Sequence, residues 1–130
     1  MKQIFILSEP AGVINNPSDL FSRIKKFDID HCQENFIIFL FDSSNKIIKS
    51  KVLFKGGLNS CLVDPKVIFR FALVNNANSI ILAHNHPSGN LSPSEEDASV
   101  FATLKKVGDL LSMKVLDSVI FNKKEFYSMS

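Results

Sequence analysis

Two histidines, a serine and an aspartate lie close together in the second half of this sequence. His84 and His86 are two positions apart, and Ser94 and Asp97 follow them after the turn-forming run Pro87-Ser88-Gly89. Two neutral imidazoles and one carboxylate form a common ligand set of catalytic zinc sites, which keep a fourth position open. The residue types and their spacing therefore predict a site for a single metal ion, with His84, His86 and Asp97 as its candidate ligands.

The two histidines follow a predicted strand. The run at 79–83 is apolar and rich in β-branched residues, which indicates a buried strand. Side chains two positions apart in a strand point to the same face of the sheet. We therefore expect the rings of His84 and His86 to reach a common point.

A predicted helix at 93–111 supplies the third ligand. Ser92 is its expected N-cap, and Glu95, three residues later, completes a capping box. Asp97 falls on or beside the apolar face of this helix, where a carboxylate is costly unless it is paired or bound to a metal. Ser94 precedes Asp97 by one turn on the same side, so its hydroxyl should project near the same point.

Each of these residues also has a purely structural interpretation. A single histidine at a strand end is commonly a hydrogen-bonding residue, and an acid in a first helical turn is favoured by the helix dipole. The combination of paired histidines, a turn, a capped helix and a core-facing Asp97 favours metal binding over these separate explanations.

The same residues resemble a known signature. His84-x-His86, followed after positions 87–93 by Ser94-x-x-Asp97, resembles the JAMM (MPN-plus) metalloprotease motif. The fuller run, His-Asn-His-Pro-Ser-Gly-Asn-Leu-Ser-Pro-Ser-Glu-Glu-Asp, is similar to the variant found in the RadC family of bacterial proteins.

The likeness to the RadC family covers residues 17–130, which is nearly the whole chain. The runs at 34–48, 65–73 and 115–117 resemble the opening strands, the first helix and the closing strand of that family. The resemblance implies a layered α/β fold of the JAMM/MPN (cytidine-deaminase-like) type, with a mixed β-sheet flanked by helices.

The resemblance also implies a role for each candidate residue. His84, His86 and Asp97 would bind Zn²⁺, with water completing the coordination. Glu34 matches the family's glutamate that takes the proton of this water, and Ser94 matches the serine that stabilises the oxyanion. The implied function is a zinc metallopeptidase or isopeptidase in which the zinc-bound water attacks an amide carbonyl. The implied partner is a peptide or an isopeptide-linked protein.

Glu34 also has a simpler explanation, as a surface acid at the start of a strand. Two positions depart from the usual RadC pattern. Ser118 stands where the family usually has a histidine, and Gly56-Gly57-Leu58 stands in place of a Gly-Thr link. Neither departure touches a predicted ligand, so both bear on substrate recognition around the site.

Two other functions stay open. RadC proteins carry a DNA-repair label, so a nucleic-acid-associated repair factor is one alternative, and a non-catalytic interaction module is the other. The net charge is only +2, and the lysine pairs are scattered, unlike the concentrated basic stripe typical of nucleic-acid binding. Inactive relatives of the fold generally lose the ligands, which are all present here.

Two further metal enzymes fit less well. An iron oxygenase with two histidines and one carboxylate would leave Ser94 without a role. A zinc deaminase needs a Pro-Cys-x-x-Cys run, which this sequence lacks.

Length and composition agree with one domain. A chain of 130 residues has the most common domain size. The prediction is a single RadC-like JAMM/MPN domain over 1–130, without the N-terminal helical DNA-binding domain of longer family members. Cys32 and Cys61 have no C-x-x-C partner and are predicted to be free thiols. No signal peptide or membrane span is apparent, so a cytoplasmic protein without a membrane partner is expected.

The remaining elements follow from hydrophobic periodicity and turn residues. They are a strand at 3–7, a loop at 15–17, a helix at 18–27, a hairpin of strands at 34–42 and 46–55, a helix at 65–76, a strand at 114–121 and a short strand near 126–127. Helices and strands mixed in this order predict an α/β layered fold with a mixed sheet.

Overall fold

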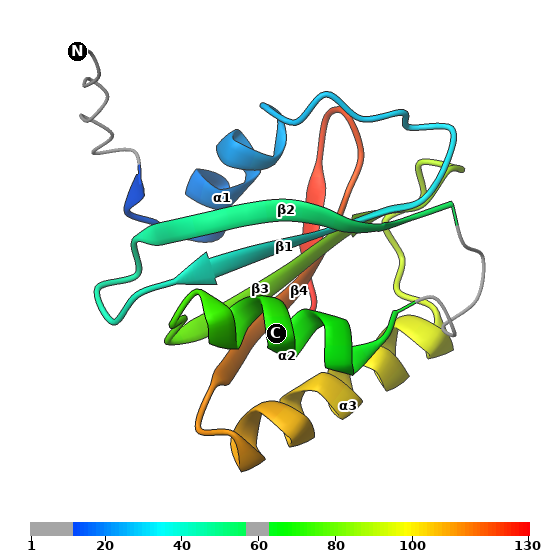
Figure 1. Ribbon diagram of the computed structural model, residues 1–130. Helices are drawn as coiled ribbons and strands as arrows, with labels where there is room; N and C mark the ends of the chain where they lie inside the picture. Colours follow the sequence, from blue (N-terminus) through cyan, green and yellow to red (C-terminus); the bar gives the residue numbers. More distant parts are fainter. Residues whose placement is uncertain (1–11, 57–62) are drawn as a thin grey trace.

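The computed structural model describes residues 12–56 and 63–130. Its elements follow in the order α1 (Pro17–Ile24), β1 (Asn35–Phe41), β2 (Ile47–Lys55), α2 (Pro65–Val74), β3 (Ser79–Asn85), α3 (Glu95–Leu110), β4 (Lys114–Phe121) and β5 (Phe126–Ser128). The strands form one sheet in the order β2-β1-β3-β4-β5 (Figure 1). Only β3 and β4 run parallel, so the predicted α/β fold with a mixed sheet is confirmed.

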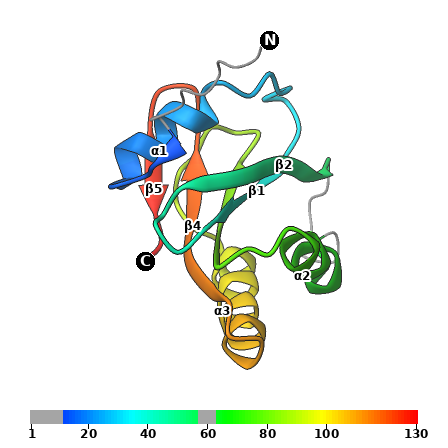
Figure 2. The same ribbon diagram turned by 60° about the vertical axis from the view of Figure 1, so that its left-hand side comes forward.

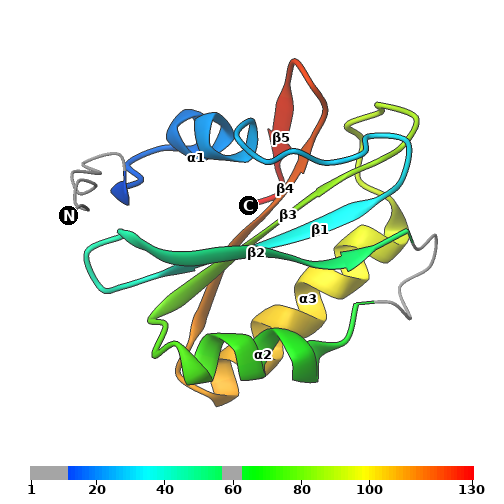
Figure 3. The same ribbon diagram turned by 45° about the horizontal axis from the view of Figure 1, so that its top comes forward.

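The helices cover both faces of this sheet. Helix α1 packs on one face, and α2 and α3 pack on the other (Figures 2 and 3). Strand β1 serves both faces by alternation: Ile38 points into the core under α2 and α3, whereas Ile37 and Phe39 point into the core under α1. All of β1 is buried, because it has a strand on each side and helices on both faces.

Helix α3 is the crossover between the parallel strands β3 and β4. Parallel strands need such a connection, and it places the start of α3 near the carboxyl end of β3. In open α/β sheets this end is where ligands usually bind.

The start of α3 differs from the prediction. The helix begins at Glu95, and its N-cap is Ser94 in place of Ser92. The capping box joins Ser94 to Asp97, whereas the prediction joined Ser92 to Glu95. Two overlapping serine-x-x-acid patterns are present, and the helix starts at the one whose acid also contacts both histidines.

Smaller boundary differences occur elsewhere. Helix α1 begins at Pro17, because the side chain of Asn16 caps it by accepting the N–H of Asp19, and it ends at Ile24. Strand β3 extends to Asn85, two residues beyond the prediction. The hairpin strands, the helix at 65–76 and the strand at 114–121 are confirmed to within a few residues.

Other sequence predictions concern the surface and the cysteines. The lysines of the edge strand β2 at 49, 51 and 55 are exposed, which is a usual protection for an edge strand. Cys32 is a free, exposed thiol. The predicted strand at 3–7 and Cys61 lie outside the described residues. Within the described ranges, no helix combines the length and apolarity that a membrane crossing requires.

Gly108 lets the end of α3 pack closely on the segment that leads into β4. A Cβ atom at this position would lie 2.3 Å from the backbone oxygen of Met113 and 3.1 Å from a side-chain carbon of Val115. We expect Gly108→Ala to destabilise the fold by about 1–3 kcal/mol, although alanine has a helix propensity better by about 1 kcal/mol. Urea denaturation measures this difference. Ser99→Ala, at an exposed position of α3, is the control and should not destabilise; equal stability of Gly108→Ala and the wild type would contradict the steric argument.

Candidate metal centre

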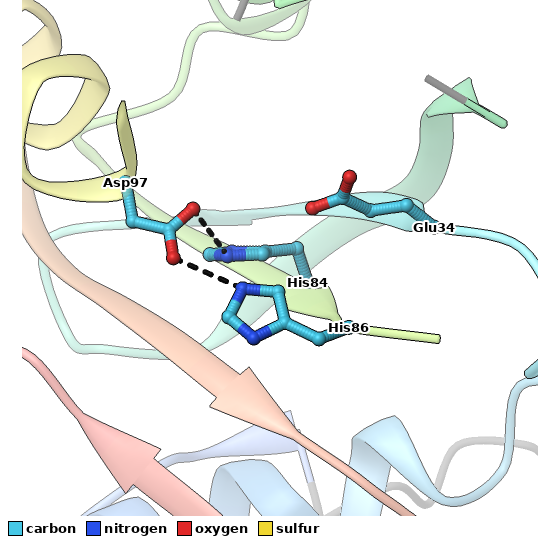
Figure 4. A group of neighbouring side chains, drawn as sticks. All are labelled: Glu34, His84, His86 and Asp97. Atoms are coloured by element: carbon cyan, nitrogen blue, oxygen red, sulfur yellow. Dashed lines mark hydrogen bonds and ion pairs between the residues drawn. The ribbon is translucent and has the colours of Figure 1, made fainter. Parts of the chain in front are cut away.

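Two histidine rings from the end of β3, His84 within the strand and His86 directly after it, meet one carboxylate from α3 (Figure 4). Nε2 of His84 lies 3.1 Å from Oδ1 of Asp97, and Nε2 of His86 lies 3.0 Å from Oδ2. The carboxylate of Glu34 lies nearby, and one ligand atom from each of the four residues falls within 4.8 Å of the others. The structure therefore gathers all three predicted ligands and Glu34 into one cluster.

Strand alternation explains why both rings point the same way. On β3, Ile80 and Leu82 face the core under α2 and α3, so His84 and His86 continue the same face beyond them. This face looks toward the first turn of α3, which carries Asp97. The prediction that the two rings share a target is confirmed.

The carboxylate of Asp97 is surrounded by polar groups. Besides the two rings, its Oδ2 accepts the backbone N–H of Ser94 at 2.9 Å. Burial raises the pKa of Asp97, but the hydrogen bond with His84, the N–H of Ser94 and the two imidazole charges outweigh it. The net pKa lies well below the ordinary value, so Asp97 is an anion at neutral pH.

A backbone carbonyl determines which ring nitrogen of His86 carries a hydrogen. Its Nδ1 lies 2.8 Å from the carbonyl oxygen of Asn90. A carbonyl only accepts hydrogen bonds, so Nδ1 carries a hydrogen. In a neutral imidazole the other nitrogen, Nε2, then presents a lone pair toward the anionic Oδ2 of Asp97. Two acceptors at 3.0 Å require a cation between them, either a proton on the ring or a metal ion.

His84 is held differently. Its ring is buried and stacks on Phe36, the residue opposite it on β1, with centroids 5.0 Å apart and planes inclined by 18°. Among the described residues, its Nδ1 has no hydrogen-bond partner. A metal-binding histidine usually has its second ring nitrogen held by a hydrogen bond. In His84 the stacked ring of Phe36 fixes the imidazole instead.

The spacing of the donor atoms suits a small divalent cation. Ligands at about 2.0–2.1 Å from a tetrahedral zinc ion lie about 3.3 Å from one another. The two nitrogen-to-oxygen distances of 3.1 and 3.0 Å are close to this value. The donor types, two imidazoles and a carboxylate, are also those that zinc accepts.

Glu34 approaches the cluster from the side opposite Asp97 (Figure 4). It directly precedes β1 and is half-buried. Burial is the largest influence on its pKa and raises it, while the charges of His84 and His86 oppose the shift; the net pKa lies above the ordinary value. A carboxylate with a raised pKa accepts a proton more readily near neutral pH.

Ser94 is connected to the cluster through Asp97. Its Oγ accepts the backbone N–H of Asp97 at 3.0 Å, while its own N–H binds that residue's carboxylate. A serine hydroxyl that accepts one bond still carries a hydrogen to donate. The predicted oxyanion donor is thus also the N-cap of α3.

Four asparagines around the cluster were not predicted to take part. Asn90 offers its carbonyl to His86, and Asn122 donates its side-chain N–H to the carbonyl of Gly89 at 3.0 Å. Asn85 and Asn35 form a buried pair behind the histidines. The sequence around Asn85 gave one indication of a role, its position between the two histidines. The other three asparagines act through contacts with backbone atoms and have no such position.

Comparison with known proteins supports the resemblance. A family profile described as RadC-like JAB domain matches residues 14–130. A UPF0758 protein of Staphylococcus aureus is 42% identical over 137 aligned residues, which cover 99% of this chain and 63% of that protein. A UPF0758 protein of Staphylococcus haemolyticus is 38% identical over 116 residues, which cover 89% of this chain and 51% of that protein.

The chain spans less than two-thirds of the length of these relatives, and their names state no activity. The fold, the histidine and aspartate cluster and the profile match nevertheless agree with one another, and the match extends over most of the sequence. This chain belongs to the RadC-like JAB-domain family.

Proposed function

We propose that this domain is a zinc-dependent hydrolase of the JAMM type that cleaves an amide or isopeptide bond. The observation that carries the proposal is the approach of two imidazole nitrogens to the two oxygens of one partly buried carboxylate, with Nδ1 of His86 held by the carbonyl of Asn90 so that its Nε2 faces the carboxylate. Membership of the family adds support, because JAB-type domains are often hydrolytic.

His84, His86 and Asp97 are the proposed metal ligands. Their donor atoms leave one side of the cluster to Glu34, which fits a site with an open coordination position. Bound zinc supplies Lewis acidity, polarising a carbonyl and lowering the pKa of water to about 7.

Glu34 is the proposed proton acceptor. Its carboxylate faces the cluster, and no hydrogen bond ties it to the other three side chains in Figure 4. It is therefore placed to take a proton from the attacking water and to return it to the leaving amine.

Ser94 is the proposed oxyanion donor. The capping box with Asp97 fixes its backbone, and its hydroxyl is held against the backbone N–H of this proposed ligand before substrate arrives. A pre-positioned donor of this kind stabilises the charge that develops on the carbonyl oxygen of the substrate.

The proposed substrate is a peptide or an isopeptide-linked protein. A hollow of about 320 Å³ adjoins His86 and is lined by His31, the turn at 87–89 and the β4–β5 connection at 122–125. Its volume falls in the range of ligand pockets, and it is large enough for one side of a peptide chain next to the cluster.

Metal binding is the first test. We expect the purified protein, stripped with chelator, to take up about one equivalent of Zn²⁺ in isothermal titration calorimetry. His86→Ala and Asp97→Asn should each weaken binding roughly 100-fold or more, since even the loss of a residue behind a ligand costs about 10–100-fold. Binding should also weaken in acid, because both imidazoles must be neutral to coordinate.

His31→Ala is the matched control, because His31 is the histidine outside the cluster. Zinc affinity should be unchanged in this variant. Equal zinc binding by the wild type and by His86→Ala would exclude the proposed centre.

Hydrolysis is the second test. Zinc-loaded protein should cleave members of a proteome-derived peptide library, with new termini identified by mass spectrometry. Glu34→Gln should retain zinc and lose about 10²–10⁴-fold in rate, the usual contribution of a positioned proton-transfer group. His86→Ala should lose both zinc and cleavage. A Glu34→Gln protein as active as the wild type would refute the role of Glu34, and a zinc-bound wild type that cleaves nothing in the library would count against the peptidase assignment.

A further inference from the structure

Asn85 lies between the two proposed ligands in sequence and points away from them. Alternation along β3 sends its side chain to the face of the sheet that packs under α1, whereas His84 and His86 face α3. The residue is 1% exposed. A buried amide is costly unless its donors and acceptor are used, so the partners of Asn85 indicate its role.

Those partners are backbone groups on either side of Glu34. Oδ1 of Asn85 accepts the backbone N–H of Asn35 at 2.8 Å. Nδ2 of Asn85 donates to the carbonyl oxygen of Gln33 at 3.0 Å and lies 3.5 Å from that of His31. The Asn85 side chain therefore binds the backbone immediately before and immediately after the proposed proton acceptor. We call this pair of contacts, to Gln33 and Asn35, the clamp.

The peptide group that joins Glu34 to Asn35 is also held at its carbonyl, by Gly56, which directly follows β2. The carbonyl of Glu34 accepts the N–H of Gly56 at 2.7 Å. Peptide groups are planar, so fixing the groups on both sides of a Cα atom fixes its two backbone dihedrals and the direction of its Cβ atom. The direction in which the Glu34 side chain leaves the backbone is thus set largely by Asn85, with help from Gly56.

Asn35 strengthens the same clamp. Its Nδ2 donates to the carbonyl oxygens of Asp30 and Gln33 at 3.0 Å each, and lies 3.3 Å from Oδ1 of Asn85. The carbonyl of Gln33 accordingly receives two side-chain donors. Asn35 is fully buried, so water does not replace these bonds.

We propose that Asn85 is a positioning residue that fixes Glu34 relative to the metal ligands. The inference rests on the proposed function, in which Glu34 accepts the proton. Because Asn85 ends β3 and lies between His84 and His86, one continuous segment carries both the ligands and the clamp. Any shift of β3 moves Glu34 together with them, and their mutual geometry is retained.

The first experiment examines the metal-free protein, so it does not depend on activity. Amide hydrogen exchange followed by NMR should show protected N–H groups at Asn35 and Gly56 in the wild type. In Asn85→Ala, we expect exchange at these two amides to accelerate at least about tenfold, because their hydrogen bonds are lost or weakened. Amides of β4 should be unaffected.

The matched control for this experiment is Asn75→Ala. Asn75 also donates its side-chain N–H to a carbonyl, that of Phe71 at 2.8 Å, but it lies at the end of α2. Exchange at Asn35 and Gly56 should not change in this variant. Unchanged exchange at both amides in Asn85→Ala would overturn the clamp.

The second experiment separates positioning from a general structural role. On a library peptide that the wild type cleaves, Asn85→Ala should lower kcat about 100-fold, the scale expected when a reacting group is displaced by about 1 Å. KM and zinc content should stay as in the wild type. In a Glu34→Gln background, the same substitution should change kcat less than about twofold, because the group it positions is already lost.

The outcomes keep the two proposals apart. An additive loss in the Glu34→Gln background, or a loss of zinc with Asn85→Ala, would overturn the positioning role and leave the hydrolase proposal standing. A wild type that binds no zinc would overturn the hydrolase proposal, while the exchange data would still decide the clamp. If Asn85→Ala fails to fold, Asn35→Ala removes the second donor to Gln33 and should show the same kcat defect to a smaller degree.

Discussion

The site depends on the contact of two imidazole nitrogens, from His84 and His86, with the partly buried carboxylate of Asp97. Each oxygen of Asp97 faces one ring, and Oδ2 also binds the N-cap of α3. An anion enclosed in this way needs positive charge between it and the rings. The contact of Asp97 with the two rings connects the end of β3 to the start of α3. The same contact favours Ser94 as the N-cap, and so determines the residue at which α3 begins. The metal hypothesis and the local fold therefore have one physical origin.

The elements that sequence alone predicts well are those whose pattern is local. The strands of the β1–β2 hairpin and β4 have strong apolar or alternating runs, and their bounds agree closely with expectation. The start of α3 was wrong by two residues, because the capping patterns from Ser92 and from Ser94 are equally good as sequence. The choice between them comes from a tertiary contact between Asp97 and the histidines, which no propensity contains.

Some residues of the candidate site could likewise be predicted from local sequence, and others could not. His84, His86 and Asp97 could be proposed from spacing, because a strand and the helix after it bring them together. Glu34 could be proposed only through the family resemblance, because it directly precedes β1 and is far in sequence from the histidines and Asp97. Asn85 was overlooked although it lies within the motif. Its partners, Asn35 and Gln33, are 50 and 52 positions away, and the contacts involve backbone atoms that carry no sequence signature.

The carbonyl that orients His86 belongs to the main chain of Asn90, so a mutation at position 90 cannot delete it. The proton on the ring is governed by the shape of the turn, in which Gly89 adopts a φ of 82° and Asn122 braces its carbonyl. A side chain at position 89 would disfavour that shape. The orientation of this ligand is thus limited by backbone conformation, so substitutions in the turn can weaken metal affinity without replacing any ligand.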